Sequence, residues 1–230
     1  MAEMSFLKDQ VRGLVLSDVV AVARCHARSG ANGGWFGVPR QVFCFVDFLG
    51  AVAYNNDPSR GEDGASTRKA VRFINEFFPR DYSSFSSLMV AMWRHGTVHN
   101  FIPFTYYAMR GNQKVTVEWT SNNSNAMHNR AVNLKMLDTE SGKNTVCLSV
   151  NTCQLADDLL YALNALIARM EREDSFRRGC LRRLERSLRA RDCMKMRMGN
   201  AAKDVIRKQI LEGPISTKGI LRGDQVQWYK

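Results

Sequence analysis

The side chains best suited to chemistry occur in one short segment, where Arg94, His95 and His99 fall within six residues. Histidine gives or takes a proton near neutral pH, and the arginine guanidinium stays charged and matches the geometry of a phosphate. A base, an acid and a cation are what cleavage of RNA without a metal requires. The segment is therefore the candidate catalytic site.

A zinc site is a second interpretation of the two histidines. His95 and His99 are four residues apart and share a face of a helix, as in the HExxH motif, but Gly96 follows His95 where that motif has Glu. The other two histidines, His26 and His128, form no ligand cluster with them in the sequence. The sequence thus predicts no metal and no cofactor.

A packing role is the third interpretation. His95 and His99 continue a stripe formed by Leu88 and Met92 at helical spacing. A histidine on the apolar face of a helix is commonly a core or interface residue that is satisfied by one hydrogen bond. In that case the segment would pack and would carry no chemistry.

The elements that must position this segment are expected to be mainly helices. In six stretches of the chain, apolar residues recur at steps of three and four residues, which is the pattern of amphipathic helices. These stretches are 6–25, 39–52, 71–78, 83–99, 155–170 and 176–188. We expect the second helix to be central, because it is apolar almost all round.

Between the fourth and fifth predicted helices, the spacing of the apolar residues changes from a period of 3.6 residues to a period of 2 residues. Apolar and polar residues alternate over 115–120, 132–136 and 146–150, the pattern of half-buried strands. A Ser-Gly turn signal joins the second strand to the third, and a long polar connection follows the first. We therefore expect a small insert of three antiparallel strands at about 113–150.

Arg94, the polar His95, three further residues and His99 resemble the R-polar-xxx-H signature of HEPN domains, the RX4-6H motif within a helix of an all-helical bundle. The order of elements is similar too, with two apolar helices before the motif helix and an amphipathic helix after it. The resemblance implies a mainly α, HEPN-like up-and-down helical bundle over 1–198, to which this chain adds the β insert. A basic C-terminal extension over 199–230 follows, and we expect it to be partly disordered.

The resemblance also implies an activity. Active HEPN members are homodimers that bring two motif helices together and cleave RNA without a metal, which makes Arg94, His99 and His95 the catalytic residues here. Dimerisation fits the spacing, because Arg94 and His99 are about 140° apart around one helix and a single protomer presents them poorly. Other members bind or scaffold, so the alternative function is a non-catalytic interaction or RNA-binding module. An antitoxin or another protein partner stays open.

A strongly basic stretch follows the β insert and the next helix. Between 166 and 198, eleven basic residues stand against five acidic ones, which gives +6 of the total charge of +11. Clustered guanidinium groups favour salt-dependent binding to phosphates, while the alternative is a solvated helix face. The predicted RNA-binding residues are Arg177, Arg178, Arg182, Arg183, Arg186 and Arg189.

Composition narrows the class of protein. The 230 residues are 45% hydrophobic and have a pI near 9.7, which favours a globular protein with a polyanionic partner. The first ten residues do not read as an export signal, and the longest apolar run is too short to span a bilayer. None of the six cysteines forms a CxxC pair. We expect a cytoplasmic protein with reduced thiols and no membrane contact.

Overall fold

The computed structural model describes residues 2–29, 37–55, 65–98, 106–110, 113–122, 132–137 and 144–192, and these residues are mainly helical. The mainly α fold class is thereby confirmed. The chain divides into two compact units, Met1–Glu185 and Arg186–Lys230. Only 186–192 of the second unit are described, so the predicted tail over 199–230 and its boundary lie outside the described residues.

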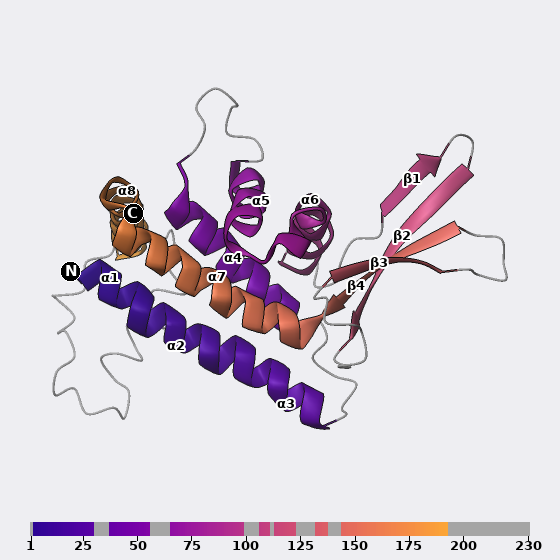
Figure 1. The fold of residues 1–230 in the computed structure, drawn as a ribbon, viewed down its shortest axis with the longest axis horizontal. Helices are drawn as coiled ribbons and strands as arrows, with labels where there is room; N and C mark the ends of the chain where they lie inside the picture. Colours follow the sequence, from indigo (N-terminus) through magenta and orange to yellow (C-terminus); the bar gives the residue numbers. More distant parts are fainter. Residues whose placement is uncertain are drawn as a thin grey trace, which may run out of the picture. The chain divides into compact units, whose positions relative to one another are not determined.

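The first helix is a continuous run that begins at Ala2. Its parts are α1 (Ala2–Ser5), η1 (Phe6–Val11), α2 (Arg12–Leu14), η2 (Val15–Val20) and α3 (Ala21–Ser29), of which η1 and η2 are π-helical turns. Its apolar residues Leu7, Val11, Val15 and Val19 are buried, whereas Leu14, which belongs to the same predicted stripe, is 48% exposed. Ion pairs from Lys8 to Glu171 and from Arg24 to Asp157 hold this run antiparallel to α7 (Thr152–Arg172), as Figure 1 shows.

Helix α4 (Gly37–Ala53) packs against α5 (Ala65–Phe77), α7 and η5 (Val90–Val98), which confirms its predicted central position. Val42, Phe43, Val46 and Leu49 are its buried residues in the middle of the helix. Gly50 makes the closest approach to α5, because a Cβ at this position would lie 2.9 Å from the carbonyl oxygen of Lys69. The two helices can pack this closely only because Gly50 has no side chain.

The segment that carries the candidate catalytic residues follows α5. It contains η4 (Arg80–Tyr82), α6 (Ser86–Met89) and the π-helical η5, and a chain of aromatic contacts joins it to α5. The ring of Phe78 lies edge-on to both Phe73 and Tyr82, with centroids 6.1 and 5.1 Å away. Helix α5 begins at Ala65, six residues before the predicted start. The prediction missed its first turn because that turn is polar and carries no apolar stripe.

A four-stranded sheet follows, formed by β1 (Tyr106–Arg110), β2 (Gln113–Asn122), β3 (Val132–Leu137) and β4 (Asn144–Asn151) in the order β1-β2-β4-β3. The pairs β1–β2 and β3–β4 are antiparallel, whereas β2 and β4 are parallel. Leu148 of β4 is opposite Trp119 of β2 and Leu134 of β3, and it is fully buried.

The prediction of three antiparallel strands was wrong in two respects. It missed β1, whose sequence Tyr-Tyr-Ala-Met-Arg lacks the alternation of apolar and polar residues that identified the other strands. It also assumed that neighbours in sequence pair with each other. The polar connection over 123–131 is too long to be a tight hairpin, and β4 lies between β2 and β3.

Helix α7 follows β4 directly. The Asn151 side chain accepts a hydrogen bond from the backbone N–H of Gln154 at 3.1 Å and so caps the N-terminus of the helix. The predicted stripe of Leu155, Leu159, Leu163, Leu166 and Met170 is buried. Glu173 has an extended backbone (φ −115°, ψ 99°) and separates α7 from α8 (Asp174–Asp192), so the basic helix restarts after a break.

Candidate functional site

Arg94 lies at the edge of the core. Met92 and Trp93, the two residues before it in η5, are fully buried, and Arg94 itself is only 8% exposed. Burial on this scale is unusual for an arginine and requires partners for its charge and its donors. The surroundings of the guanidinium group therefore decide what it can do.

Its partners come from two other helices. The Nε group donates to both carboxylate oxygens of Asp47 in α4, at 2.6 and 2.5 Å. The terminal nitrogens donate to the hydroxyl oxygens of Thr67 and Ser66 in the first turn of α5, at 3.2 and 2.9 Å. A single side chain thus connects η5 with α4 and α5.

These contacts give Arg94 a structural role. The ionic hydrogen bond to Asp47 is of the strong, charge-assisted type, and the Arg94 side chain is 10% exposed against 26% for that of Asp47. The backbone of His95 continues η5, but its side chain and all of His99 lie outside the described residues. The catalytic role of Arg94, His95 and His99 stays a prediction.

Two of the predicted RNA-binding arginines share one carboxylate in the first turn of α8. Arg178 is 3.3 Å from Asp174, and Arg177 forms an ion pair with the same residue. Both side chains are more than a third exposed. Exposed pairs of this kind contribute at most about 1 kcal/mol, so both guanidinium groups can exchange their partner for a phosphate at little cost.

Arg183 faces inward. Its Nε and terminal nitrogen donate to the backbone carbonyls of Val52 and Ala53 at 2.6 and 2.8 Å, and it also donates to Asn55 at 3.3 Å. The last carbonyls of a helix have no partner within the helix and carry its partial negative charge. Arg183 therefore caps the C-terminus of α4, a structural task that the charge pattern of α8 did not reveal.

The remaining predicted RNA-binding residues occupy the second half of α8. Arg182 and Arg186 are exposed, and neither makes an ion pair with another residue in the part of the chain that the structure describes. The side chain of Arg189 lies outside the described residues. Arg186 belongs to the second compact unit, whereas Arg177, Arg178 and Arg182 belong to the first.

A hollow beside α8 holds charged residues that the sequence did not single out. Its volume is about 630 Å³, and its lining includes Tyr54, Arg72, Arg169, Phe176 and Arg183. The guanidinium carbon of Arg72 lies 4.1 Å from the centre of the Tyr54 ring, and that of Arg169 lies 4.2 Å from the centre of the Phe176 ring.

Glu76 organises the charges of this hollow. Its carboxylate accepts a hydrogen bond from the Tyr54 hydroxyl and forms an ion pair with Arg169. The Nε atom of Arg72 lies 3.6 Å from the same carboxylate. Burial, together with the hydrogen bond to Glu76, raises the pKa of Tyr54 well above its usual value, so Tyr54 stays a neutral donor. The pair of Arg72 and Glu76 has the i to i+4 spacing that a sequence can reveal, whereas the partners from α4 and α7 become visible only in the fold.

A buried carboxyl group lies elsewhere in the bundle. Asp158 of α7 is 7% exposed, and it accepts hydrogen bonds from the Tyr82 hydroxyl at 2.7 Å and from Gln154 at 2.9 Å. Burial raises the pKa of Asp158 above its usual value, although both hydrogen bonds work against that shift.

Within the described ranges, no group of three or more His, Cys, Asp or Glu residues is placed to hold a metal ion. The cysteines described there, Cys25, Cys44, Cys153 and Cys180, are free thiols. None of the helices described has the length and apolar character needed to cross a membrane.

No family model, curated protein or solved structure matches the chain.

Proposed function

We propose that this protein is a HEPN-like helical module that binds RNA through the basic surface of α8. One observation carries the proposal: Asp174 is shared by Arg177 and Arg178, and Arg182 makes no ion pair with a described residue. The helix thus keeps more exposed positive charge than its own carboxylates neutralise. Such charge is what attracts a polyanion, because each phosphate contact releases counterions.

Binding without cleavage agrees best with the contacts of Arg94. A cation that stabilises a phosphorane has to point its donors at the substrate. The donors of Arg94 instead serve Asp47, Ser66 and Thr67, which lie on two neighbouring helices. The guanidinium group therefore supports the bundle, and we assign RNA contact to α8.

Titration of a labelled single-stranded RNA, followed by fluorescence anisotropy between about 50 and 200 mM salt, tests this proposal. The wild-type protein should lose affinity steeply as salt rises. Arg182→Gln should bind more weakly and show a shallower salt dependence, by about 0.7 in the log–log slope for one lost contact with a single strand. The matched control is Arg24→Gln, which removes one exposed charge that pairs with Asp157.

Two outcomes would count against the proposal. No binding by the wild-type protein would remove RNA as the ligand, and salt-independent binding would show that phosphate contacts with α8 do not hold the RNA. Equal slopes for Arg182→Gln and the wild-type protein would show that α8 is only a solvated helix face.

Metal-independent cleavage by a homodimer is the second candidate. The observation that favours it is that Arg94 and His95 are consecutive residues of η5, next to His99 in the sequence. Incubation of RNA with the protein and a chelator separates the two functions. Intact RNA supports the binding module, whereas cleavage that His99→Ala abolishes would establish the nuclease, and cleavage that requires zinc would indicate a metal site.

A further inference from the structure

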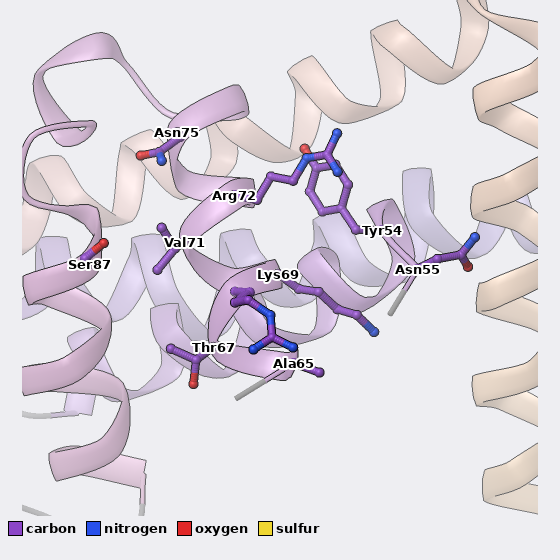
Figure 2. Close-up of a pocket in the computed structure, with 10 residues that line it drawn as sticks. Tyr54, Asn55, Ala65, Thr67, Lys69, Val71, Arg72, Asn75 and Ser87 are labelled. Carbon is purple, nitrogen blue, oxygen red and sulfur yellow. The ribbon is translucent and has the colours of Figure 1, made fainter. Parts of the chain in front are cut away.

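A second hollow lies on α5, next to the C-terminal end of α4. Its volume is about 510 Å³, within the range of pockets that hold small ligands. Figure 2 shows that most of its lining comes from α5, with Tyr54 and Asn55 contributed by the two residues that follow α4 and Ser87 by α6. The ten lining residues are Tyr54, Asn55, Ala65, Thr67, Arg68, Lys69, Val71, Arg72, Asn75 and Ser87.

The charges of this lining have one sign. Arg68, Lys69 and Arg72 contribute three cations, and none of the ten residues is Asp or Glu. The other polar side chains of the lining are neutral and carry hydrogen-bond donors, and they are those of Tyr54, Asn55, Thr67, Asn75 and Ser87. The spacing of i, i+1 and i+4 on one helix places the three cations on the same side of α5.

Lys69 is the cation of this lining that has no counterion among the residues that the structure describes. It makes no ion pair or hydrogen bond with any residue in the described ranges. Partial burial and the nearby Arg183 lower its pKa. Burial disfavours the charged form of the amine, and the like charge of Arg183 acts in the same direction.

The other cations around Lys69 are held in place. Arg72 lies over the Tyr54 ring and 3.6 Å from Glu76, as Figure 2 shows for the ring. Arg183 is fixed by the carbonyls of Val52 and Ala53. Glu76, the carboxylate that pairs with Arg72, is already bound by Tyr54 and Arg169. An anion that enters the hollow therefore meets a preorganised positive site.

We propose that this hollow binds a phosphate monoester, as found at the end of an RNA strand or on a mononucleotide, with Lys69 as its principal ligand. A monoester carries nearly two negative charges at neutral pH and a phosphodiester carries one, so a concentrated set of cations favours the monoester. For an RNA ligand, the proposal rests on the proposed function. The backbone of the RNA would lie on α8, and its terminal phosphate would lie in this hollow.

The test compares three versions of one RNA oligonucleotide, with a 5′-phosphate, a 3′-phosphate or only hydroxyl ends. The wild-type protein should bind one of the phosphorylated strands about tenfold more tightly than the hydroxyl strand, the gain expected from one charge-assisted hydrogen bond. Lys69→Gln should lose this preference. Arg182→Gln is the matched control, since it should weaken binding to all three strands by the same factor and keep the preference.

Direct titration with adenosine monophosphate and with inorganic phosphate separates the two sources of the monoester. Saturable binding of either that Lys69→Gln abolishes, in a protein that binds no RNA, would uphold the phosphate site while the proposed function fails. Equal affinity for the three strands, together with no binding of either small ligand, would overturn the proposal. Unchanged end preference in Lys69→Gln would overturn it as well. Circular dichroism of each variant confirms that it is folded.

Discussion

The Arg94 guanidinium group is held by side chains that are 27 to 47 residues away in the chain. The sequence identified Arg94 as an unusual residue because of its neighbours His95 and His99. It could not identify Asp47 as its partner, because nothing in the spacing of α4 and η5 indicates which faces meet. The structural role of Arg94 became visible only with the packing of three helices.

Asp47→Asn and Arg94→Met should both destabilise the fold. Each leaves a largely buried charge without its partner, which costs about 3 kcal/mol, the low end for buried ion pairs because about a quarter of Asp47 is exposed. Urea unfolding measures the change. Arg24→Gln is the control, because its pair with Asp157 is exposed and should change the free energy of unfolding by less than about 1 kcal/mol.

This expectation affects how the catalytic prediction is tested. Loss of cleavage in an Arg94 variant would have two explanations, a missing cation or a weakened fold. His99→Ala is therefore the cleaner variant. An Arg94→Met protein that unfolds at the same urea concentration as the wild-type protein would show that the contacts with Asp47, Ser66 and Thr67 contribute nothing to stability.

Asp158 makes the stability of the bundle depend on pH. Burial raises its pKa in the folded protein, so the folded state binds its proton more tightly than the unfolded state does. This contribution to stability is complete below the unfolded pKa, near 3.8, and it is lost as the pH rises through the raised folded pKa. Stability from this group therefore falls, and does not rise, with increasing pH.

Asp158→Asn should remove that fall. The measurement is the free energy of unfolding in urea at several pH values from about 4 upward, for the variant and the wild-type protein. The difference between the two curves isolates Asp158 from the other carboxylates. Parallel curves throughout this range would show that Asp158 has an ordinary pKa.

At the scale of elements, Gly50 and Gly13 are both helical glycines in different surroundings. A Cβ at Gly50 would lie 2.9 and 3.0 Å from the carbonyl oxygen and carbon of Lys69, which are backbone atoms that cannot rotate away. Nothing lies within 4 Å of a Cβ at Gly13. The same substitution should therefore have opposite effects at the two positions.

Gly50→Ala should lower the free energy of unfolding by about 1–3 kcal/mol, because α4 and α5 must move apart. Gly13→Ala should raise it by about 0.5–1 kcal/mol, because alanine restricts the unfolded chain and favours the helix. Thermal or urea unfolding measures both. A stabilising effect of Gly50→Ala would show that the two helices separate without cost.

The elements themselves were predictable to different degrees. Helical periodicity located the first helix, α4 and α7 well, because each buries one continuous apolar stripe. The prediction missed the start of α5 and the strand β1, because their residues show neither the helical period of 3.6 nor the strand period of 2. The parallel pairing of β2 with β4 was also not predictable, because register between strands depends on contacts between segments that are separate in sequence.

The candidate site shows the same division. Charge content indicated α8 correctly as the basic helix, but the sequence grouped Arg183 with Arg182 although they differ in role. Arg183 caps α4 and Arg182 is exposed, which depends on the face of α8 that meets α4. The hollow around Lys69 had no signal in the sequence, since its residues come from α5, from α6 and from the two residues that follow α4.

At the scale of the whole molecule, the oligomeric state distinguishes the two candidate functions. His95 and His99 continue the stripe of Leu88 and Met92, which would serve a dimer if it faced a second copy of the chain. Met92 is fully buried within its own chain, so this stripe faces the core at that position. The poor geometry of Arg94 and His99 within one helix remains the argument for a composite site.

We predict a homodimer, and light scattering after size exclusion should then give about twice the 26.1 kDa of the chain at tens of micromolar, where an interface of ordinary size is populated. If the second candidate function holds, the composite site is lost when the dimer dissociates, and cleavage per chain should fall on dilution. Binding of RNA by α8 uses residues of one chain and should be unaffected by dilution in the same range. A monomer at tens of micromolar that still cleaves RNA would contradict the composite site, because all of its catalytic groups would then belong to one chain.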